Sequence, residues 1–177
     1  MKQGEKQSAF DPLNALLERS GARLCALAFL ITGDWDVSID AVAGSLDAGL
    51  KADALYTARR LVAAEAVAAI RPRLRESAVR IAAMTVDPGE WLGPATEMSS
   101  LRPPTRADVE RALLSIDSFP RVVLLLTVFE GFSIADAGRL LETNDRLVRD
   151  AQVIGLLVLT RQLSRQTQEG KLWVCRN

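Results

Sequence analysis

The stretch that decides the fold lies near the C-terminus and reads SIADAGRLLETNDRLVRDAQVIGLLVL, from Ser133 to Leu159. Ser133, followed three residues later by Asp136, is a capping pattern that begins one helix, and Asn144 is a natural N-cap for the next. Two helices with so short a connection predict a helix-turn-helix, the unit that lays its second helix in the DNA major groove. The second helix continues into an apolar run from Val153 to Leu159. The stretch alone therefore leaves two interpretations open, a DNA reader and a protein-binding helix.

The composition of the 177 residues favours an all-α protein. About half of the residues are apolar (49%), but only 5% are aromatic, and Ala and Leu, both good helix formers, dominate. The formal net charge is zero, so no global electrostatic field attracts the chain to nucleic acid. This length is sufficient for a sizeable core in one domain or two small ones.

Several functional classes find no support in the residue types. Histidine is absent and the two cysteines, Cys25 and Cys175, lie far apart, which argues against a zinc site and against His-based catalysis. We expect no catalytic residues, no metal and no cofactor. The sequence MKQGEKQSAFDP has no apolar core typical of a signal peptide, and no apolar run reaches the roughly 20 residues of a membrane helix. We therefore expect a cytoplasmic protein with reduced cysteines and no membrane contact.

Apolar periodicity and helix breakers predict three parts: a helical domain over residues 1–86, a linker over 87–104, and a second helical domain over 105–177. The linker contains four of the seven prolines, a density at which no helical pattern survives. Trp91 within it and Trp35 in the first domain are expected to pack. In the first domain Gly33 should end one helix and Pro72 should break another. The helices expected are Asp11–Ile31, Val37–Leu50, Ala52–Ile70, Leu74–Met84, Arg106–Ser115, Phe119–Glu130, Ser133–Leu141 and a last one from Asn144.

The segment Asp108–Asp150 resembles region 4 of bacterial RNA polymerase sigma factors of the extracytoplasmic-function type. Features of that family occur here in the same order: a Pro-Arg pair, a Val/Leu run, a Glu-Gly turn, a Ser-x-x-Asp cap, a small residue in the first helix of the motif, and a Val-Arg pair in the recognition helix. The residues that carry these features are Pro120, Arg121, Glu130, Gly131, Ser133, Asp136, Gly138, Val148 and Arg149.

The N-terminal half is similar to region 2 of the same family. LLERSGARLCALAFLITGDWDVSIDAVAGSL resembles its first helix, the Thr-Gly-Asp break and the start of the next helix, and ALYTARRLVAAEAVAAIR resembles the stretch that leads into the promoter-melting contacts. The resemblance implies a divergent sigma-factor-like transcription regulator that binds core RNA polymerase and promoter DNA. It also implies that the segment Asp36–Asp47 docks on polymerase.

The resemblance places DNA contacts at two sites. At the start of the last helix, Asn144 and Arg146 would read bases and Arg149 would contact phosphate. The second site is the stretch Arg59–Arg80, which contains six arginines and two glutamates, where only Tyr56 offers an aromatic platform for a melted strand. The arginines we assign to this second site are Arg59, Arg60, Arg71 and Arg73.

The alternative function is a sigma-like protein-interaction or dimerisation module with little or no DNA binding. Residues 105–177 contain ten basic and nine acidic residues, whereas a DNA-binding domain usually carries a clear basic excess. Positions where the family places Arg or Lys hold Ile154, Leu156 and Leu157 here. We assign these three residues to a partner interface, for self-association or for an anti-sigma factor.

Overall fold

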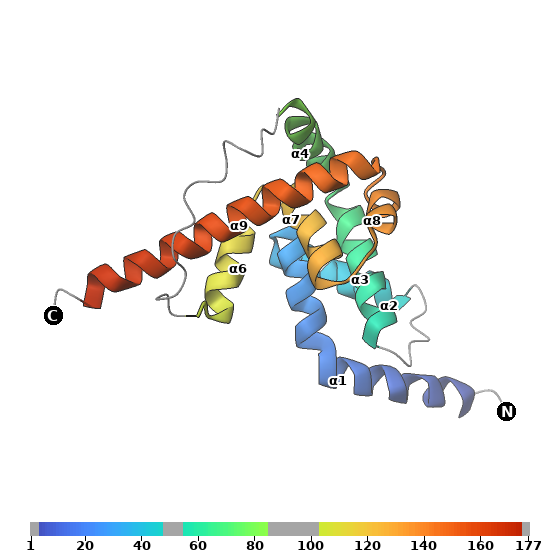
Figure 1. The fold of residues 1–177 in the computed structure, drawn as a ribbon. Coiled ribbons are helices and arrows are strands. Elements are labelled where there is room, and N and C mark those ends of the chain that lie inside the picture. The colour runs from blue at the N-terminus through green and yellow to red at the C-terminus, as the bar shows by residue number, and fades with distance from the viewer. Residues whose placement is uncertain (1–3, 48–54, 85–102, 175–177) are drawn as a thin grey trace. The chain divides into compact units, whose positions relative to one another are not determined.

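The computed structural model describes residues 4–47, 55–84 and 103–174, and every regular element in them is a helix (Figure 1). The all-α prediction is thus confirmed. By their internal contacts the residues form two compact units, Met1–Pro72 and Arg73–Asn177. Within the described ranges, none of the helices combines the length and the apolar character needed to cross a membrane. The elements are α1 (Gly4–Thr32), α2 (Trp35–Asp47), α3 (Leu55–Ala69), α4 (Arg71–Ala83), α6 (Arg106–Leu114), α7 (Ser118–Leu124), the π-helix η2 (Leu125–Phe129), α8 (Ile134–Leu140) and α9 (Asp145–Val174).

The first unit is a packing of α1, α2 and α3, each of which contacts the other two. Its centre is filled by aliphatic and small side chains rather than aromatic ones. Alanines at the contacts let the helix backbones approach closely, so that few large side chains are needed to reach the density of a protein interior. The residues exposed by no more than 1% in this unit include Leu24, Ala28, Ile31, Val62, Ala66 and Val67.

The Thr-Gly-Asp segment separates α1 from α2 by two local devices. Gly33 adopts a left-handed conformation, with φ of 72°, and its amide donates to the Phe29 carbonyl at 2.7 Å, which ends α1 as glycine commonly does. Oδ1 of Asp34 then accepts hydrogen bonds from the amides of Asp36 (3.0 Å) and Val37 (3.2 Å) and so caps α2. The stop predicted at Gly33 is confirmed.

The break predicted at Pro72 is also present, and it coincides with the change of unit. α3 ends at Ala69 and α4 begins at Arg71, so that Pro72 occupies the first turn of α4, where its missing N–H is tolerated. From Arg73 onward α4 belongs to the second unit. Residues 85–102, which contain most of the predicted linker 87–104 and Trp91, lie outside the described residues.

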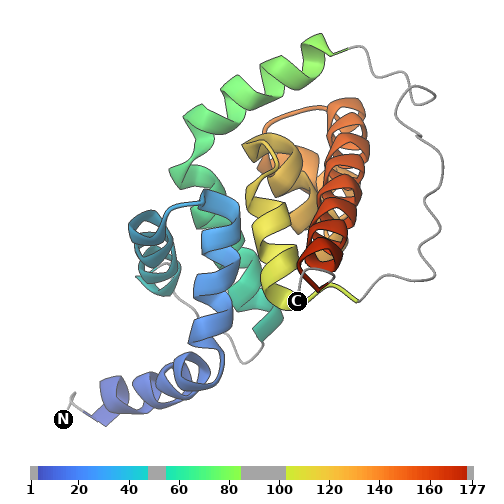
Figure 2. The same cartoon turned by 90° about the vertical axis from the view of Figure 1, so that its left-hand side faces the viewer.

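The second unit is organised around α9, which packs against α6, α7 and α8; both views show these shorter helices beside it (Figures 1 and 2). α9 and α7 lie in close contact at Gly155. A Cβ atom there would lie 2.8 Å from Cγ of Leu124 and 3.0 Å from the carbonyl oxygen of Pro120, so glycine is what allows α9 to cross α7 at this distance. Side chains exposed by no more than 1% around this crossing include Phe119, Val122, Leu126, Val148 and Ala151.

The predicted helix Phe119–Glu130 is regular only in its first half and continues as the π-helix η2. The Glu130 amide donates to the Leu125 carbonyl at 2.9 Å, five residues back. The Thr127 hydroxyl donates to the Val123 carbonyl at 2.7 Å, the acceptor that an α-helical amide would use, and such back-bonding disturbs the helical ladder. Gly131, with φ of 68°, then turns the chain.

Candidate nucleic-acid interface

The connection between α8 and α9 is held in a compact shape by Gly138. The Thr143 amide donates to the Gly138 carbonyl at 2.9 Å, and a Cβ on Gly138 would lie only 3.1 Å from the Thr143 carbonyl oxygen. Glu142, with φ of 54°, is left-handed without being glycine, a conformation that is unfavourable for most residues. At the other end of α8, the Ser133 hydroxyl accepts from the Asp136 amide at 3.0 Å, as the capping pattern predicted.

The first turns of α9 present polar side chains to solvent while their inner face is fixed in the core. Oδ1 of Asn144 accepts from the Leu147 amide at 2.9 Å, so the N-cap predicted for this residue is present. The Arg146 and Arg149 side chains are 91% and 63% exposed. Val148 is fully buried between them, which sets the direction in which both arginines point.

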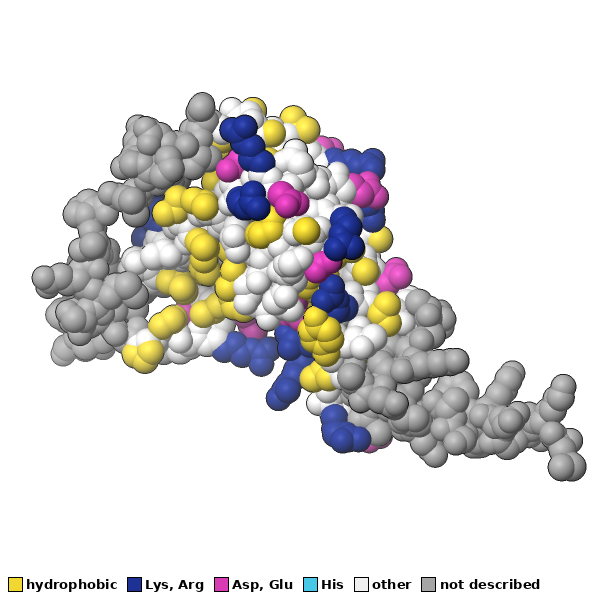
Figure 3. Space-filling view, turned by 45° about the vertical axis from the view of Figure 1, so that its right-hand side comes forward, with side chains coloured by type: hydrophobic (Ala, Val, Ile, Leu, Met, Phe, Trp, Pro, Cys, Tyr) yellow, Lys and Arg dark blue, Asp and Glu magenta, His cyan; other side chains and the backbone are white. Residues whose placement is uncertain are grey.

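Both arginines have an acidic neighbour one helical turn away. Arg146 Nε lies 3.8 Å from Asp150 Oδ2, and Arg149 Nη2 lies 4.0 Å from Asp145 Oδ2. In the upper half of Figure 3, Lys and Arg side chains likewise lie next to Asp and Glu side chains. Exposed pairs at such distances contribute little energy, so a phosphate group could displace the carboxylates. They nevertheless cancel the local charge that would attract DNA from a distance.

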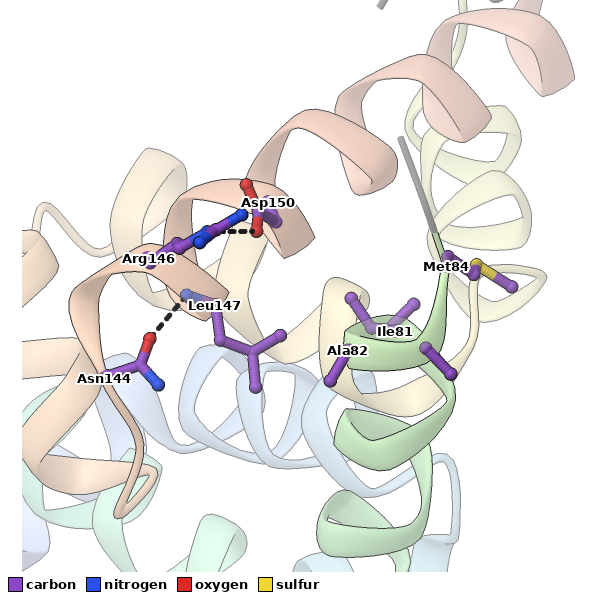
Figure 4. A pocket seen from close by; sticks show the side chains of 8 residues that line it. Ile81, Ala82, Met84, Asn144, Arg146, Leu147 and Asp150 are labelled. Atoms are coloured by element: carbon purple, nitrogen blue, oxygen red, sulfur yellow. Dashed lines mark hydrogen bonds and ion pairs between the residues drawn. The ribbon is translucent and has the colours of Figure 1, made fainter. Parts of the chain in front are cut away.

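A pocket of about 470 Å³ separates the start of α9 from the last turn of α4 (Figure 4). Leu147 points into the space between the two helices, and the Arg146–Asp150 pair lies on its rim. The predicted base readers Asn144 and Arg146 line this pocket from the α9 side and are at the same time exposed to solvent. The pocket is lined by Ile81, Ala82, Ala83, Met84, Asn144, Arg146, Leu147 and Asp150.

The arginines of the second predicted DNA site lie on two helices. Arg59 and Arg60 belong to α3, and Arg71 and Arg73 belong to α4. On α3 the guanidinium of Arg60 lies over the Tyr56 ring, 5.4 Å from its centroid, and also donates to the Tyr56 hydroxyl. Tyr56 is 58% exposed, so this pair offers an aromatic face beside a cation.

Two arginines of α4 are engaged with acids of the second unit. Arg80 donates to both oxygens of Asp117, from Nη2 at 2.9 and 3.0 Å and from Nε at 3.2 Å. Arg75 Nη2 lies 2.9 Å from Glu142 Oε2. Burial opposes ionisation of Asp117, but hydrogen bonds from Arg80, the Ser118 amide and Ser77, together with the charge of Arg80, hold its pKa below the usual value. The sequence predicted neither of these two ion pairs, although Asp117, directly before Ser118, is a residue type that commonly caps a helix.

Arg121, the arginine of the Pro-Arg pair, has a structural position. It is 6% exposed, and its Nη1 donates to the carbonyl oxygens of Leu114 at 3.1 Å and Ile116 at 3.4 Å. Burial lowers the pKa of Arg121, and the nearby charge of Arg73 lowers it further, while Asp117 acts in the opposite direction. The side chain therefore ties the end of α6 to α7 and is not presented to a ligand.

The apolar part of α9 is divided between core and surface. Gly155 is buried, Ile154 and Leu157 are half-buried, and Val153 and Leu156 are each 42% exposed. Gln152 Nε2 donates to the Thr127 hydroxyl at 3.0 Å, so this face of α9 lies beside η2. Of the three residues assigned to a partner interface, Leu156 is the most accessible.

In the first unit, α2 presents an apolar and acidic face. Trp35 is 54% exposed and Ile39 is 47% exposed, and the acidic residues Asp36 and Asp40 are exposed beside them. The packing expected of Trp35 is partial, because its indole meets the Phe29 ring edge-on at 5.7 Å while the rest remains accessible. Asp36, Ile39 and Asp40 lie in the segment Asp36–Asp47 that the resemblance assigns to polymerase docking, and Trp35 directly precedes it.

Searches against protein-family models, curated proteins and solved structures found no match to this chain. Among the described residues, no group of three or more Cys, Asp or Glu side chains is placed to hold a metal ion.

Proposed function

We propose that this chain is a divergent sigma-factor-like transcription regulator that binds core RNA polymerase and promoter DNA. The observation that supports it best is the position of Arg146 and Arg149. Both are largely exposed on the first two turns of a long helix that follows a compact connection from α8. That is the end of a recognition helix that approaches base edges in helix-turn-helix proteins.

The geometry of the polar residues supports a role for each of them. The Oδ1 atom of Asn144 caps α9. The Nδ2 amide group of the same side chain would donate to an acceptor on a base edge. Arg146, the more exposed arginine, would donate to guanine O6 and N7, the commonest specific contact of arginine in the major groove. Arg149, one turn further along, would contact the phosphate backbone.

The first unit would supply the other two contacts of a sigma-like protein. Tyr56 stacked with Arg60 combines an aromatic surface with a cation, the combination that binds single-stranded bases. The exposed Trp35 and Ile39 on α2, flanked by acids, would be the surface for polymerase, since exposed apolar groups with a polar rim are typical of protein interfaces.

The DNA contact is tested by a salt titration of binding to a fluorescent duplex of mixed sequence. Wild-type affinity should fall steeply with salt, and replacing both Arg146 and Arg149 with alanine should weaken binding and reduce the log–log slope by about one to two. The matched control is Arg161→Ala, also exposed on α9 but about 18 Å further along the helix; it should leave both quantities nearly unchanged. Absence of measurable binding at low salt would refute the DNA-binding part of the proposal.

A second candidate, a protein-interaction module, is favoured by the exposure of Val153 and Leu156 on α9. If α9 mediates self-association, light scattering should show an oligomer that Leu156→Asp dissociates. Val79→Asp, at an exposed valine on α4, is the control for adding a charge at an apolar surface position. A monomer unaffected by Leu156→Asp would rule out self-association through this face.

A further inference from the structure

The pocket between the last turn of α4 and the start of α9 has apolar walls. Ile81 and Ala82 line it from α4, and Leu147 points into it from α9 (Figure 4). Ile81 is 4% exposed and Leu147 is half-buried, so both walls are held by the core of the second unit, to which all the lining residues belong. The volume of about 470 Å³ is within the range of pockets that bind small molecules.

The rim of this pocket carries one cation and one anion side by side. Arg146 Nε lies 3.8 Å from Asp150 Oδ2, which is longer than a hydrogen bond. Neither side chain makes a hydrogen bond within the part of the chain that the structure describes. The N–H groups of the guanidinium and the lone pairs of the carboxylate are therefore open to a ligand. Asn144 adds the N–H groups of its Nδ2 atom to the same rim, because only its Oδ1 atom is used to cap α9.

The adjacent opposite charges restrict the kind of ligand that fits. A simple anion bound to Arg146 would lie close to the Asp150 carboxylate, and a simple cation bound to Asp150 would lie close to the guanidinium, so each would be repelled by a like charge. A ligand that carries both charges next to each other avoids both repulsions. A free α-amino acid has this property, since its ammonium and carboxylate groups are bonded to the same carbon atom.

We propose that the pocket binds a free α-amino acid with an aliphatic side chain. The guanidinium of Arg146 matches the planar carboxylate of the ligand, and Asp150 accepts hydrogen bonds from its ammonium group. The side chain of the ligand leaves water between the aliphatic walls formed by Ile81 and Leu147. This inference goes beyond the proposed function and does not depend on it, since binding is measured without DNA.

The test titrates the full chain with leucine, isoleucine, valine and methionine and follows its backbone amide signals by heteronuclear NMR. We expect leucine to bind with a Kd of about 0.1–1 mM and to shift the signals of Ala82, Ala83 and Leu147. Three analogues of leucine each lack one feature: leucinamide has no carboxylate, isocaproate has no ammonium group, and alanine has almost no apolar side chain. Each analogue should bind at least about three- to tenfold more weakly than leucine.

Two variants assign the charged contacts to their residues. Arg146→Gln should weaken leucine binding about three- to tenfold without weakening the binding of leucinamide, and Asp150→Asn should weaken leucine binding without weakening that of isocaproate. The matched control carries Arg139→Gln and Asp136→Asn, which remove an exposed ion pair on α8 that does not line the pocket. It should bind leucine as the wild type does.

Three results would overturn the proposal. The first is that none of the four amino acids shifts these signals at about 10 mM, well above the expected Kd. The second is that isocaproate or leucinamide binds as tightly as leucine, which would show that the two charges are not recognised together. The third is that both pocket variants bind leucine with wild-type affinity, which would place the binding site elsewhere.

Discussion

Gly155 is the position where the smallest substitution should have the clearest effect on the second unit. In an unhindered helix, glycine to alanine stabilises by about 1 kcal/mol. Here the added Cβ would lie 2.8 Å from Leu124 Cγ and 3.0 Å from the Pro120 carbonyl oxygen, and Leu124 is fully buried. Overpacking of a core costs about 1–3 kcal/mol. The steric cost opposes and should exceed the gain in helix propensity, and we expect Gly155→Ala to lower the free energy of unfolding by up to about 2 kcal/mol.

The assay is thermal unfolding by circular dichroism, with hydrogen exchange of the amides of α7 and α9 to assign the loss to this crossing. A loss of 1 kcal/mol in a unit of this size lowers Tm by about 4–8 °C. The control is Gly21→Ala in α1, where a Cβ would meet nothing within 4 Å; it should stabilise its own unit by about 0.5–1 kcal/mol.

A double-mutant cycle with Leu124→Ala tests the cause of the loss. Once the Leu124 side chain is shortened, the contact with Cγ is gone, and Gly155→Ala should become much less destabilising, with a coupling of about 1 kcal/mol or more. The reasoning is refuted if Gly155→Ala stabilises the protein as Gly21→Ala does, or if its effect is the same in both backgrounds.

Three further results are expected. Arg121→Met should lower the free energy of unfolding by about 1–3 kcal/mol in urea titrations, because two carbonyls lose their donor, whereas Arg139→Met at an exposed position should change it by less than about 0.5 kcal/mol. Thr105→Val removes the hydroxyl that accepts from the Asp108 amide and should cost about 1 kcal/mol, seen as faster hydrogen exchange in α6. The pKa of Asp117 is lowered in the folded protein. Its ionised carboxylate therefore stabilises the fold above the usual aspartate pKa, and this stabilisation is lost as the pH falls through the lowered pKa. The variant Asp117→Asn should lose less stability in acid than the wild type.

The parts of the fold that were predicted correctly depend on residues close together in sequence. Gly33 ends one helix, and Ser133 and Asn144 act as caps on the amides that follow them. Such signals are local because a capping side chain bonds to backbone two or three residues away. Pro72 breaks the helix for the same kind of reason.

The parts that could not be predicted depend on contacts between distant residues. Arg80 and Asp117 are 37 positions apart, and Gly155 is required only because α7 crosses α9 at that point. No spacing rule relates such residues before the tertiary packing is known. The sequence also did not predict the π-helix η2. A threonine hydroxyl such as that of Thr127, which disturbs the helix here, is accommodated in most helices without a change of pitch.

For the candidate site, the sequence indicated the polar residues at the start of α9 but not their surroundings. Asn144, Arg146 and Arg149 do lie on adjacent turns. The arginines assigned to the second DNA site are divided between α3, which carries Arg59 and Arg60, and α4, which carries Arg71 and Arg73.

The central claim, that this chain works as a sigma-like subunit, is tested most directly by its binding to core RNA polymerase. We expect the purified chain to form a stable complex with core enzyme in size-exclusion chromatography. Ile39→Asp with Asp40→Lys on the exposed face of α2 should abolish the complex, whereas Glu18→Lys, at an exposed acid of α1, should not. Failure of the folded wild-type chain to bind core polymerase at micromolar concentration would contradict the account.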